Sequence, residues 1–436
     1  MNQTAEKTLT FAPVKASERI NSLDVIRGIA LLGILLMNIN GMGLPFAYLD
    51  PTISGGSDGL NLLVWEINSL FFEGTMRGLF TLLFGAGVIL LTSRLEKKGA
   101  GIFTADIYYR RILWLLIFGI GNVYILLWDG DILYPYAIFG LMLFPFRNTP
   151  VKKLFLVAGI LVSIGILWDI SDYHNKLELQ KEALAIQNLQ DQGQVISEVQ
   201  ESTLEEWTKF KTKHTQEEVD ELIAQMHQGY FAVLQAKIEQ NQFMQTWFPY
   251  RLWVWDILSM MLVGMAFFKL GIFQGQRSNR FYLLMLLIGY GLGLSINYYE
   301  TKTMIDSNFD SLVILRMDQT YQVGRILVTM GHVGLFMLFI KSGILKFLQR
   351  SLAAVGRLAL TNYLMHSIVT SIIFYGDGLA LYGELQRYQL YYIVGGIWLF
   401  QLIVSPIYIK YFAYGPAEWI WRSLTYQKLQ PIRLKN

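Results

Sequence analysis

The sequence predicts an all-α fold: a polytopic transmembrane helical bundle of about ten crossings with one outer helical insertion. Three observations predict it. The chain has 436 residues, of which 53% are hydrophobic and only 16% are charged, whereas soluble domains average about 25% charged residues. Apolar windows near the ~20 residues that cross a bilayer recur from residue 22 to residue 410. These runs are continuous rather than alternating, which favours helices over barrel strands.

The crossings are predicted from the apolar windows in chain order. They lie at 22–43, 75–95, 109–127, 131–147, 151–170, 249–270, 280–298, 320–341, 353–375 and 388–410. The segment 60–73 interrupts this series, because a further crossing there would move the basic loop at 94–111 to the outer side. We therefore predict that 60–73 is an amphipathic or re-entrant outer helix, with Glu66 facing protein or water.

Three regions are expected along the chain. Residues 1–170 form an N-terminal transmembrane bundle that begins with an Asp-x-x-Arg-Gly motif, residues 171–248 an extracytoplasmic helical insertion, and residues 249–436 a C-terminal transmembrane domain. The insertion is acidic and rich in Glu, Gln, Lys and Leu. Thr215 and Glu218 have the spacing of a capping box, which predicts a helix from there to about residue 240.

The other acidic residues of the insertion are expected to form a solvated face. Its histidines, His174, His214 and His227, do not have the spacing of a metal site, so no metal is predicted. The chain has no cysteine, which excludes disulfides.

Basic residues predict the orientation of the bundle. Lys7, Lys15 and Arg19 precede the first apolar run, and no A-x-A cleavage site follows it, so we expect this run to be retained as a helix. Alternate connections hold most of the other basic residues, which by the positive-inside rule places both termini in the cytoplasm. These residues are Arg94, Lys97, Lys98, Arg110 and Arg111; Arg147, Lys152 and Lys153; Arg277 and Arg280; Lys341, Lys346 and Arg350; and Lys410, Arg422, Lys428, Arg433 and Lys435.

Polar residues in the first crossing indicate a functional face. Asp24 and Arg27 are three residues apart and share a helix face. Asn38 lies eleven residues beyond Arg27, close to three turns, and falls on the same face. Charges in a membrane are unfavourable unless they face protein or a water-filled cavity. Arg357, like Asp24 and Arg27, lies near a cytoplasmic helix end. The simpler interpretations are a structural Asp24–Arg27 ion pair and a snorkelling Arg357.

The middle of the membrane holds two further pairs. His332 and His366 fall near the centres of the eighth and ninth crossings. Arg325 lies seven residues before His332, and Asn362 four before His366, so each pair shares a face. A histidine here can act as a general base, although a neutral, hydrogen-bonded imidazole is also compatible with the pattern, as is an Asn362 that only bonds a neighbouring helix.

The outer part of the membrane holds a third group of polar residues. Asp256 lies in the sixth crossing, beside Arg251, and Asp131 opens the fourth crossing with Tyr134 one turn later. Together with the histidines these residues could line a cavity that opens to the outside. Walker, G-x-S-x-G, H-E-x-x-H and dinucleotide-binding motifs are absent. Gly85-Ala86-Gly87 is expected to be a small-residue packing patch.

Several segments resemble the YeiB family of bacterial membrane proteins. The opening RINSLDVIRGIALLGILLMNI resembles the start of that family, and GRLALTNYLMHSIV and FAYGPAEWIWRSLTY are similar to its C-terminal domain of unknown function. FEGTMRGLFTLLFGAG, DGDILYPYAIFGL and DILSMMLVGMAFFKLG also resemble it. The resemblance covers nearly all of the chain outside 171–248 and implies a bacterial inner-membrane protein.

The first-crossing motif also resembles two groups of transmembrane acyltransferases. One is the heparan-alpha-glucosaminide N-acetyltransferase type, and the other O-acylates bacterial polysaccharides. The resemblance implies transfer of an acyl group from cytoplasmic acyl-CoA to an acceptor on the far side. Arg27 matches an arginine of the polysaccharide enzymes, but Asn38 stands where they carry a histidine, and asparagine cannot act as a general base.

The main functional hypothesis is therefore an acyltransferase that uses acyl-CoA, with acetyl-CoA as the example. Arg27 and Arg357 would bind donor phosphates, His366 or His332 would deprotonate the acceptor, and Asn38 or Asn362 would donate to the oxyanion. The remaining candidates for substrate binding are Asp24, Glu66, Asp131, Tyr134, Asp256 and Arg325.

Two alternatives stay open. The same charges could form the substrate path of a transporter or exporter of a small polar solute, although no internal repeat supports this. The insertion could also serve a scaffold protein. The expected partners are membrane lipids and a small-molecule, lipid-headgroup or glycan acceptor, but no nucleic acid. A homodimer is compatible with the sequence.

Overall fold

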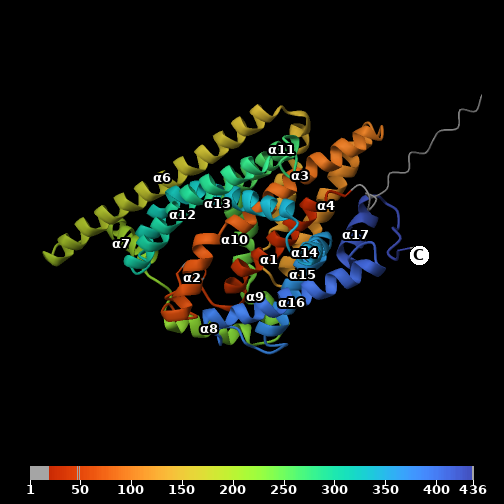
Figure 1. Ribbon diagram of the computed structural model, residues 1–436. Helices are drawn as coiled ribbons and strands as arrows, with labels where there is room; N and C mark the ends of the chain where they lie inside the picture. Colours follow the sequence, from red (N-terminus) through yellow and green to blue (C-terminus); the bar gives the residue numbers. More distant parts are fainter. Residues whose placement is uncertain (1–18, 47, 49, 435–436) are drawn as a thin grey trace, which may run out of the picture.

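The computed structural model describes residues 19–46, 48 and 50–434, so Lys7, Lys15 and Lys435 lie outside the described residues. Within that part of the chain every regular element is a helix, and an isolated bridge between Phe412 and Arg433 is the one β-type pairing. The all-α prediction is confirmed (Figure 1). In chain order the helices are α1 (Asn21–Gly43), α2 (Gly59–Phe71), α3 (Thr75–Lys97), α4 (Phe103–Tyr124), α5 (Leu133–Leu141), the 3₁₀-helix η2 (Phe144–Asn148), α6 (Val151–Asp191), α7 (Glu198–Lys211), α8 (Gln216–Met226), α9 (Tyr230–Ala236), α10 (Ile238–Phe248), the π-helix η3 (Pro249–Leu258), α11 (Ser259–Lys269), α12 (Asn279–Asp306), α13 (Ser311–Ser342), α14 (Lys346–Arg357), α15 (Ala359–Phe374), α16 (Arg387–Tyr411) and α17 (Pro416–Thr425).

Helices occupy all ten predicted crossings. Seven described segments are long and apolar enough to cross a membrane by themselves. The predicted crossings 109–127, 131–147 and 353–375 coincide with α4, with α5 followed by η2, and with the end of α14 followed by α15, which are less apolar or shorter. The seven segments are Asn21–Gly43, Gly59–Lys97, Val151–Asp191, Ile238–Lys269, Asn279–Asp306, Ser311–Ser342 and Arg387–Tyr411.

One end of the bundle, which we call the basic side, gathers the loops that are rich in basic residues. The start of α1, the end of α3, the start of α4 and α17 meet there, because Arg27, Arg94, Arg111 and Arg422 line one cavity. The loops that the charge pattern assigns to one side of the membrane therefore lie together.

The opposite end, which we call the insertion side, gathers the other loops. The backbone N–H of Gly383 donates to the carbonyl of Gly43 at 2.9 Å, which joins the end of α1 to the loop before α16. Lys237 and Asp129 form an ion pair at 2.6 Å, which joins the insertion to the loop before α5. Figure 1 shows α8 and α9 beside α16 at this end.

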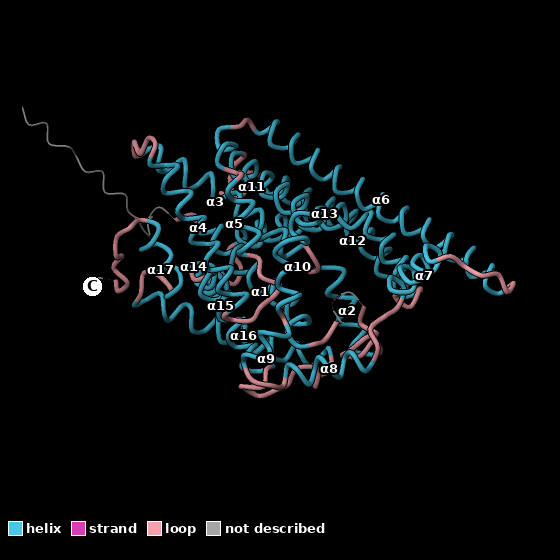
Figure 2. Tube along the Cα trace, turned by 180° about the vertical axis from the view of Figure 1, so that it is seen from behind, coloured by secondary structure: helices cyan, strands magenta, loops and turns pink. Residues whose placement is uncertain are grey.

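The insertion extends far beyond the bundle. α6 continues without a break through residue 170 and ends at Asp191. Its 41 residues measure about 61 Å at 1.5 Å per residue, roughly twice the hydrocarbon thickness of a bilayer. In Figures 1 and 2 it runs beside α12 and α13 to α7. The predicted capping box of Thr215 and Glu218 is confirmed at the start of α8, but three short helices, α8 to α10, replace one helix to residue 240.

Glycines allow the closest helix crossings. A Cβ on Gly28 would lie 2.0 Å from the carbonyl oxygen of Leu352, and one on Gly356 would lie 1.9 Å from that of Asp24. The backbones of α1 and α14 therefore touch at the Asp-x-x-Arg-Gly motif. α3 and α11 cross in the same way, because a Cβ on Gly85 would lie 1.9 Å from the carbonyl oxygen of Met261. Gly85 thus packs as expected, whereas a Cβ on Gly87 would meet nothing within 4 Å.

α2 and α3 together form one interrupted span. The predicted helix at 60–73 exists as α2, but it leads into the bundle, where the carbonyl of Phe71 lies 2.8 Å from Nε2 of His332 on α13. Gly74 then adopts a left-handed conformation (φ +66°) and α3 begins at Thr75. Non-helical backbone inside a membrane is tolerated where it is buried in protein or lines a cavity.

Candidate functional site

A cavity of about 260 Å³ opens on the basic side. Six arginines and two carboxylates line it, which gives these side chains a formal charge of +4. Its inner part is apolar and aromatic, with Leu83, Phe84, Leu133, Tyr136 and Tyr363 in its walls. We call it the arginine cavity. Its charged residues are Arg19, Asp24, Arg27, Arg94, Arg111, Arg357, Glu418 and Arg422.

The two carboxylates of the arginine cavity neutralise only part of this charge. Asp24 pairs with Arg27 at 3.0 Å and lies 3.7 Å from Arg19. Glu418 instead caps α15, because it accepts hydrogen bonds from the backbone N–H groups of Leu360 (2.6 Å) and Thr361 (3.1 Å). Burial raises the pKa of Glu418. The carboxyl group of Glu418 is therefore engaged in hydrogen bonds to the backbone of α15.

Two of the remaining arginines lie over aromatic rings. The guanidinium of Arg111 lies 3.6 Å from the ring centroid of Trp421, and that of Arg422 lies 4.8 Å from the ring of Tyr414. Burial, together with the charge of Arg19, lowers the pKa of Arg422. Such stacking leaves the edge of a guanidinium able to donate hydrogen bonds. The Nε atoms of Arg357 and Arg422 are buried without a partner among the described residues. This arrangement suits an anion with several charged oxygens.

A buried tyrosine–aspartate pair closes the inner end of the arginine cavity. The hydroxyl of Tyr363 donates to Oδ1 of Asp131 at 3.2 Å. Asn122 also donates to Oδ1, at 2.7 Å, and the backbone N–H of Tyr134 donates to Oδ2 at 2.8 Å. Asp131 belongs to the loop between α4 and α5 on the insertion side, and only 3% of it is exposed. The Tyr363 side chain therefore connects the arginine cavity to a loop of the opposite side.

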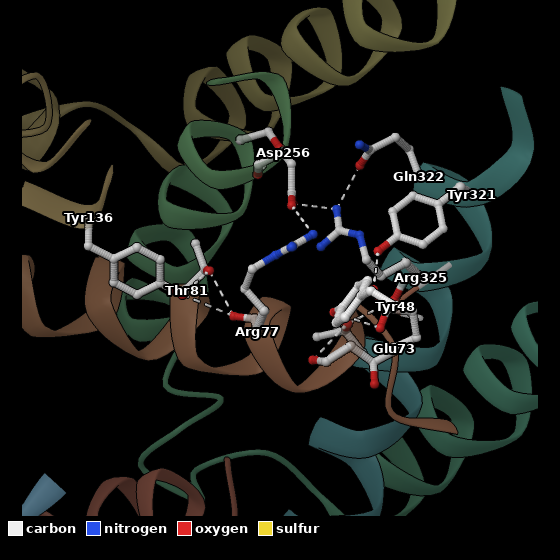
Figure 3. Close-up of polar contacts among 12 residues, drawn as sticks. Tyr48, Glu73, Arg77, Thr81, Tyr136, Asp256, Tyr321, Gln322 and Arg325 are labelled. Atoms are coloured by element: carbon white, nitrogen blue, oxygen red, sulfur yellow. Dashed lines mark hydrogen bonds and ion pairs between the residues drawn. The ribbon is translucent and has the colours of Figure 1, made fainter. Parts of the chain in front are cut away.

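A second polar cluster lies between α3, η3 and α13, and we call it the ion-pair network (Figure 3). Asp256 lies 2.9 Å from Nη2 of Arg77 and 2.5 Å from Nη2 of Arg325. Asp256 and Arg325 are 2% and 1% exposed. Arg325 also donates to Gln322 at 2.7 Å. Two guanidinium groups thus share one buried carboxylate.

The ion-pair network reaches the protein surface through Glu73. The hydroxyls of Tyr48 and Tyr321 donate to the two oxygens of Glu73, at 2.9 and 3.3 Å. Tyr48 is 39% exposed, and Glu73 and Tyr321 are half-buried. In Figure 3 this group lies beside the Arg325 side chain, away from Asp256.

Tyr136 connects the ion-pair network to the arginine cavity. Its side chain lines the cavity, and its hydroxyl donates to the carbonyl of Arg77 at 3.1 Å and lies 2.5 Å from Oγ1 of Thr81. Polar groups therefore continue from the arginine cavity through α3 to Asp256 and on toward Glu73.

Two irregular helices shape the ion-pair network. Asp256 is carried by the π-helix η3, and such segments often occur at functional sites. Gly74 provides room for Arg325, because a Cβ there would lie 2.2 Å from Cδ of Arg325 and 2.2 Å from the hydroxyl of Tyr321. The break between α2 and α3 therefore admits the arginine from α13.

The structure brings together the three residues that were predicted near cytoplasmic helix ends, and it leaves Asn38 outside the cavity that they line. Asp24, Arg27 and Arg357 line the arginine cavity. Asn38 does not line it, although the spacing places it on the face of Arg27. Asn40 is the buried asparagine of α1, and its Oδ1 accepts a hydrogen bond from Arg387 at 3.1 Å.

The two predicted histidines are enclosed and lie apart from the arginine cavity. Both are buried, and neither lines it. Nδ1 of His332 lies 2.6 Å from the hydroxyl of Tyr290, while Nε2 faces the end of α2. Nε2 of His366 lies 2.9 Å from the amide nitrogen of Gln401. Arg325 and His332 do share a face, as predicted, since both contact residues next to the α2–α3 break.

The remaining candidates occupy separate positions. Asn362 bridges α14 and α16 through the carbonyl of Val355 and the hydroxyl of Ser405, both at 3.2 Å. Tyr134 donates to the carbonyl of Gln245 at 3.0 Å. Glu66 is half-buried on α2.

The pairing of Asp256 is a correction to the sequence analysis. Arg251 pairs with Asp172 on α6 at 2.5 Å, whereas Asp256, five residues later, faces Arg77 and Arg325. Residues five apart in an α-helix already point about 140° away from each other, and in η3 Arg251 and Asp256 likewise have different partners.

Sequence reasoning missed several residues of both sites. Glu73 and Arg77 had the clearest signal in the sequence. They are opposite charges four residues apart in an apolar segment, a spacing similar to the three residues between Asp24 and Arg27. Arg94, Arg111 and Arg422 were assigned only to basic loops. Tyr136 and Tyr363 carried no signal, since tyrosine is common in membrane helices.

Comparison with known proteins identifies the family. Residues 267–428 match the family model described as "Protein of unknown function (DUF418)". "Uncharacterized protein YxaH" of Bacillus subtilis (strain 168) is 30% identical to this chain over 442 residues, which cover 98% of this chain and 99% of that protein. "Uncharacterized protein YeiB" of Escherichia coli (strain K12) is 29% identical, over 96% of this chain and 99% of its own length. The chain belongs to the YeiB family.

A third relative, "Uncharacterized 39.9 kDa protein in amylase 3'region" of Bacillus acidopullulyticus, is 25% identical over 97% of this chain. No solved structure matches the chain significantly. The resemblance noted in the sequence to the YeiB family is therefore confirmed along the whole chain. The names of these relatives give no reaction, so an account of function depends on the two sites.

Proposed function

We propose that this YeiB-family protein is a transmembrane acyltransferase that takes acyl-CoA from the cytoplasmic side and acylates an acceptor on the opposite side. The observation that carries the proposal is the arginine cavity, which combines a formal charge of +4 at its mouth with an apolar interior. Acyl-CoA has the complementary distribution, with phosphates at one end and a weakly polar thioester at the other. Arginine binds phosphate through fixed, bidentate hydrogen bonds.

Arg27, Arg111 and Arg357 are the proposed phosphate ligands. They come from α1, α4 and α14, and their side chains meet at the cavity. With the basic side in the cytoplasm, as the positive-inside rule predicts, the donor would enter where acyl-CoA is made. The pantetheine arm would then extend along Leu83, Phe84 and Leu133 toward Tyr363.

The chemical step needs a group that takes the acceptor's proton. In this step the oxygen or nitrogen of the acceptor bonds to the thioester carbonyl carbon, the C–S bond breaks, and CoA leaves as the thiolate. We assign the proton to Asp131, reached through the hydroxyl of Tyr363, because this pair closes the inner end of the cavity. His366 and His332 are less suitable, because their hydrogen-bond partners Tyr290, Phe71 and Gln401 do not line the cavity, whereas the partner of Asp131, Tyr363, does.

Donor binding and acyl transfer test the proposal separately. Purified protein is incubated with radiolabelled acetyl-CoA and a panel of hydroxyl and amine acceptors, and CoA binding is measured by calorimetry. Arg111→Gln and Arg357→Gln should each weaken CoA binding about tenfold to a hundredfold, which is the value of a charge-assisted contact. Arg350→Gln is the matched control, because Arg350 is an exposed arginine outside the cavity.

Asp131→Asn should abolish acyl transfer and leave CoA binding intact, because the amide keeps the shape of the carboxylate but cannot accept the proton. Acetyl-CoA that neither binds nor donates its acyl group would refute the proposal.

A second candidate, transport of a small polar solute, is favoured by the interrupted α2–α3 span. Broken helices commonly form substrate sites in transporters, and polar groups follow the break from Tyr136 to Glu73. Counterflow of a labelled solute in proteoliposomes would support transport, and acyl transfer without such flux would exclude it.

A further inference from the structure

We propose that Arg77 and Arg325 form a binding site for an oxyanion, a carboxylate or a phosphate group, that enters from the insertion side past Glu73 and Tyr48. This site lies on the other side of Tyr136 from the arginine cavity. It does not depend on acyl transfer being the reaction. The proposal stands on hydrogen-bond donors without partners, on the balance of charge and on the local backbone.

The first argument is the number of buried donors without a partner. Nε and Nη1 of Arg325 and Nε of Arg77 are buried and have no hydrogen-bond partner among the described residues. Arg325 itself is 1% exposed. Buried guanidinium N–H groups are strongly unfavourable when they are left unpaired. Three such donors on two neighbouring arginines match the several oxygen atoms of one carboxylate or phosphate.

The second argument is the distribution of charge. Within the part of the chain that the structure describes, Asp256 is the one carboxylate that both guanidinium groups contact. Glu73 could neutralise the second arginine, but its oxygens instead accept hydrogen bonds from the hydroxyls of Tyr48 and Tyr321. One positive charge next to Asp256 is therefore not matched by a direct ion pair, and an anionic ligand would match it. Figure 3 shows the Glu73 group and Asp256 on different sides of Arg325.

The third argument is the backbone around the two arginines. α2 and α3 are interrupted at Gly74, and η3 is a π-helix of ten residues that carries Asp256. Both irregular segments meet the same arginines, because Gly74 contacts Arg325 and Asp256 pairs with Arg77. Irregular backbone at membrane depth is maintained where it lines a site. The exposed Tyr48 marks the entrance on the insertion side.

The experiment uses full-length protein purified in phosphate-free detergent and titrated with inorganic phosphate or with acetate. Trp253 is a local reporter, because the guanidinium of Arg77 lies 5.2 Å from its ring centroid. We expect saturable binding of at least one of these anions, with a change in tryptophan fluorescence that disappears in Trp253→Phe. Calorimetry on the same variant should still detect the anion, which separates loss of the reporter from loss of the site.

Two variants of opposite expected sign make the test specific. Arg325→Lys keeps the charge but removes the forked donors, and should weaken binding about tenfold. Asp256→Asn removes the competing carboxylate and should strengthen binding, seen as a larger rise in melting temperature on adding the anion than in the native protein. The opposite signs rule out a general effect of misfolding.

Arg357→Lys is the control for the arginine cavity and should leave the Trp253 response unchanged. If Arg357→Lys abolishes binding while Arg325→Lys has no effect, the anion occupies the arginine cavity and the proposal is wrong. Absence of saturable binding of both anions would also overturn it. Added phosphatidylglycerol that displaces phosphate would identify a lipid headgroup as the ligand, whereas no displacement would identify a soluble oxyanion.

Discussion

Gly28 gives the sharpest test of how the bundle is held together at the arginine cavity. A Cβ at this position would lie 2.0 Å from the carbonyl oxygen of Leu352 and 3.2 Å from the backbone nitrogen of Gly356. Both are backbone atoms, so no side-chain rotation relieves the overlap. To reach an ordinary contact of 3.4 Å, α1 and α14 must move apart by about 1.4 Å.

A separation of this size has two consequences. The apolar contacts across the crossing, including those of Val25 and Leu352 in the core, lose a quarter to a half of their attraction for each gap of 0.5–1 Å. Overpacking typically costs 1–3 kcal/mol, so we expect Gly28→Ala to lower the free energy of unfolding by about 2–3 kcal/mol. Arg27 also moves away from Arg357, which should weaken CoA binding at the arginine cavity.

The assay is reversible unfolding in mixed detergent–SDS micelles, followed by circular dichroism. Gly291→Ala is the matched control, because a Cβ there would meet nothing within 4 Å in another membrane helix, and alanine favours helix over glycine by up to about 1 kcal/mol. Gly356→Ala should resemble Gly28→Ala. The double variant should cost less than the sum, because one displacement relieves both overlaps. A Gly28→Ala protein as stable as Gly291→Ala would refute the close crossing.

Three further predictions concern buried polar groups. Lys237→Met should destabilise the protein by about 3–5 kcal/mol, measured by SDS unfolding, because it leaves Asp129 unpaired, and a second change, Asp129→Leu, should recover much of this loss. His332→Phe should cost about 1–3 kcal/mol, because it removes bonds to Tyr290 and to the end of α2; unchanged stability would argue against this bridge. Burial raises the pKa of Glu418, so the folded chain keeps the proton of this carboxyl group to higher pH than the unfolded chain does. The protonated group therefore contributes its full share to the free energy of unfolding below the ordinary pKa of glutamate, and this share is lost as pH rises through the raised pKa. Unfolding measured from pH 4 upward should show this slope, and Glu418→Gln should remove it.

Sequence reasoning reached the arginine cavity only in part. Asp24, Arg27 and Arg357 were expected near cytoplasmic helix ends, and they do line one cavity. Their partners Arg94, Arg111 and Arg422 lie on α3, α4 and α17, which are distant from one another in sequence. Helical periodicity relates residues of one helix and not those of separate helices, so only the packing of α17 against α4 shows that these side chains converge.

The ion-pair network shows the same limit from within the helices. Helical periodicity relates residues of one continuous α-helix, and Arg325 and His332 were correctly placed on one face by it. It cannot relate the residues on the two sides of the interruption after α2, and it does not reveal that Asp256 in η3 faces Arg77 on α3 and Arg325 on α13. The histidines stood out by residue type alone, and tertiary packing encloses them.

Composition and the lengths of the apolar runs determined that this chain is a helical membrane protein, and its segments also determined its family. The helical membrane class depends on the free energy of transfer of each segment from water to lipid, a local quantity that the residues of that segment determine. The tertiary structure alone decided which charges share a cavity and which stay separate. That outcome depends on backbone-to-backbone crossings at Gly28 and Gly85 and on the break at Gly74, where contacts between distant segments determine the geometry.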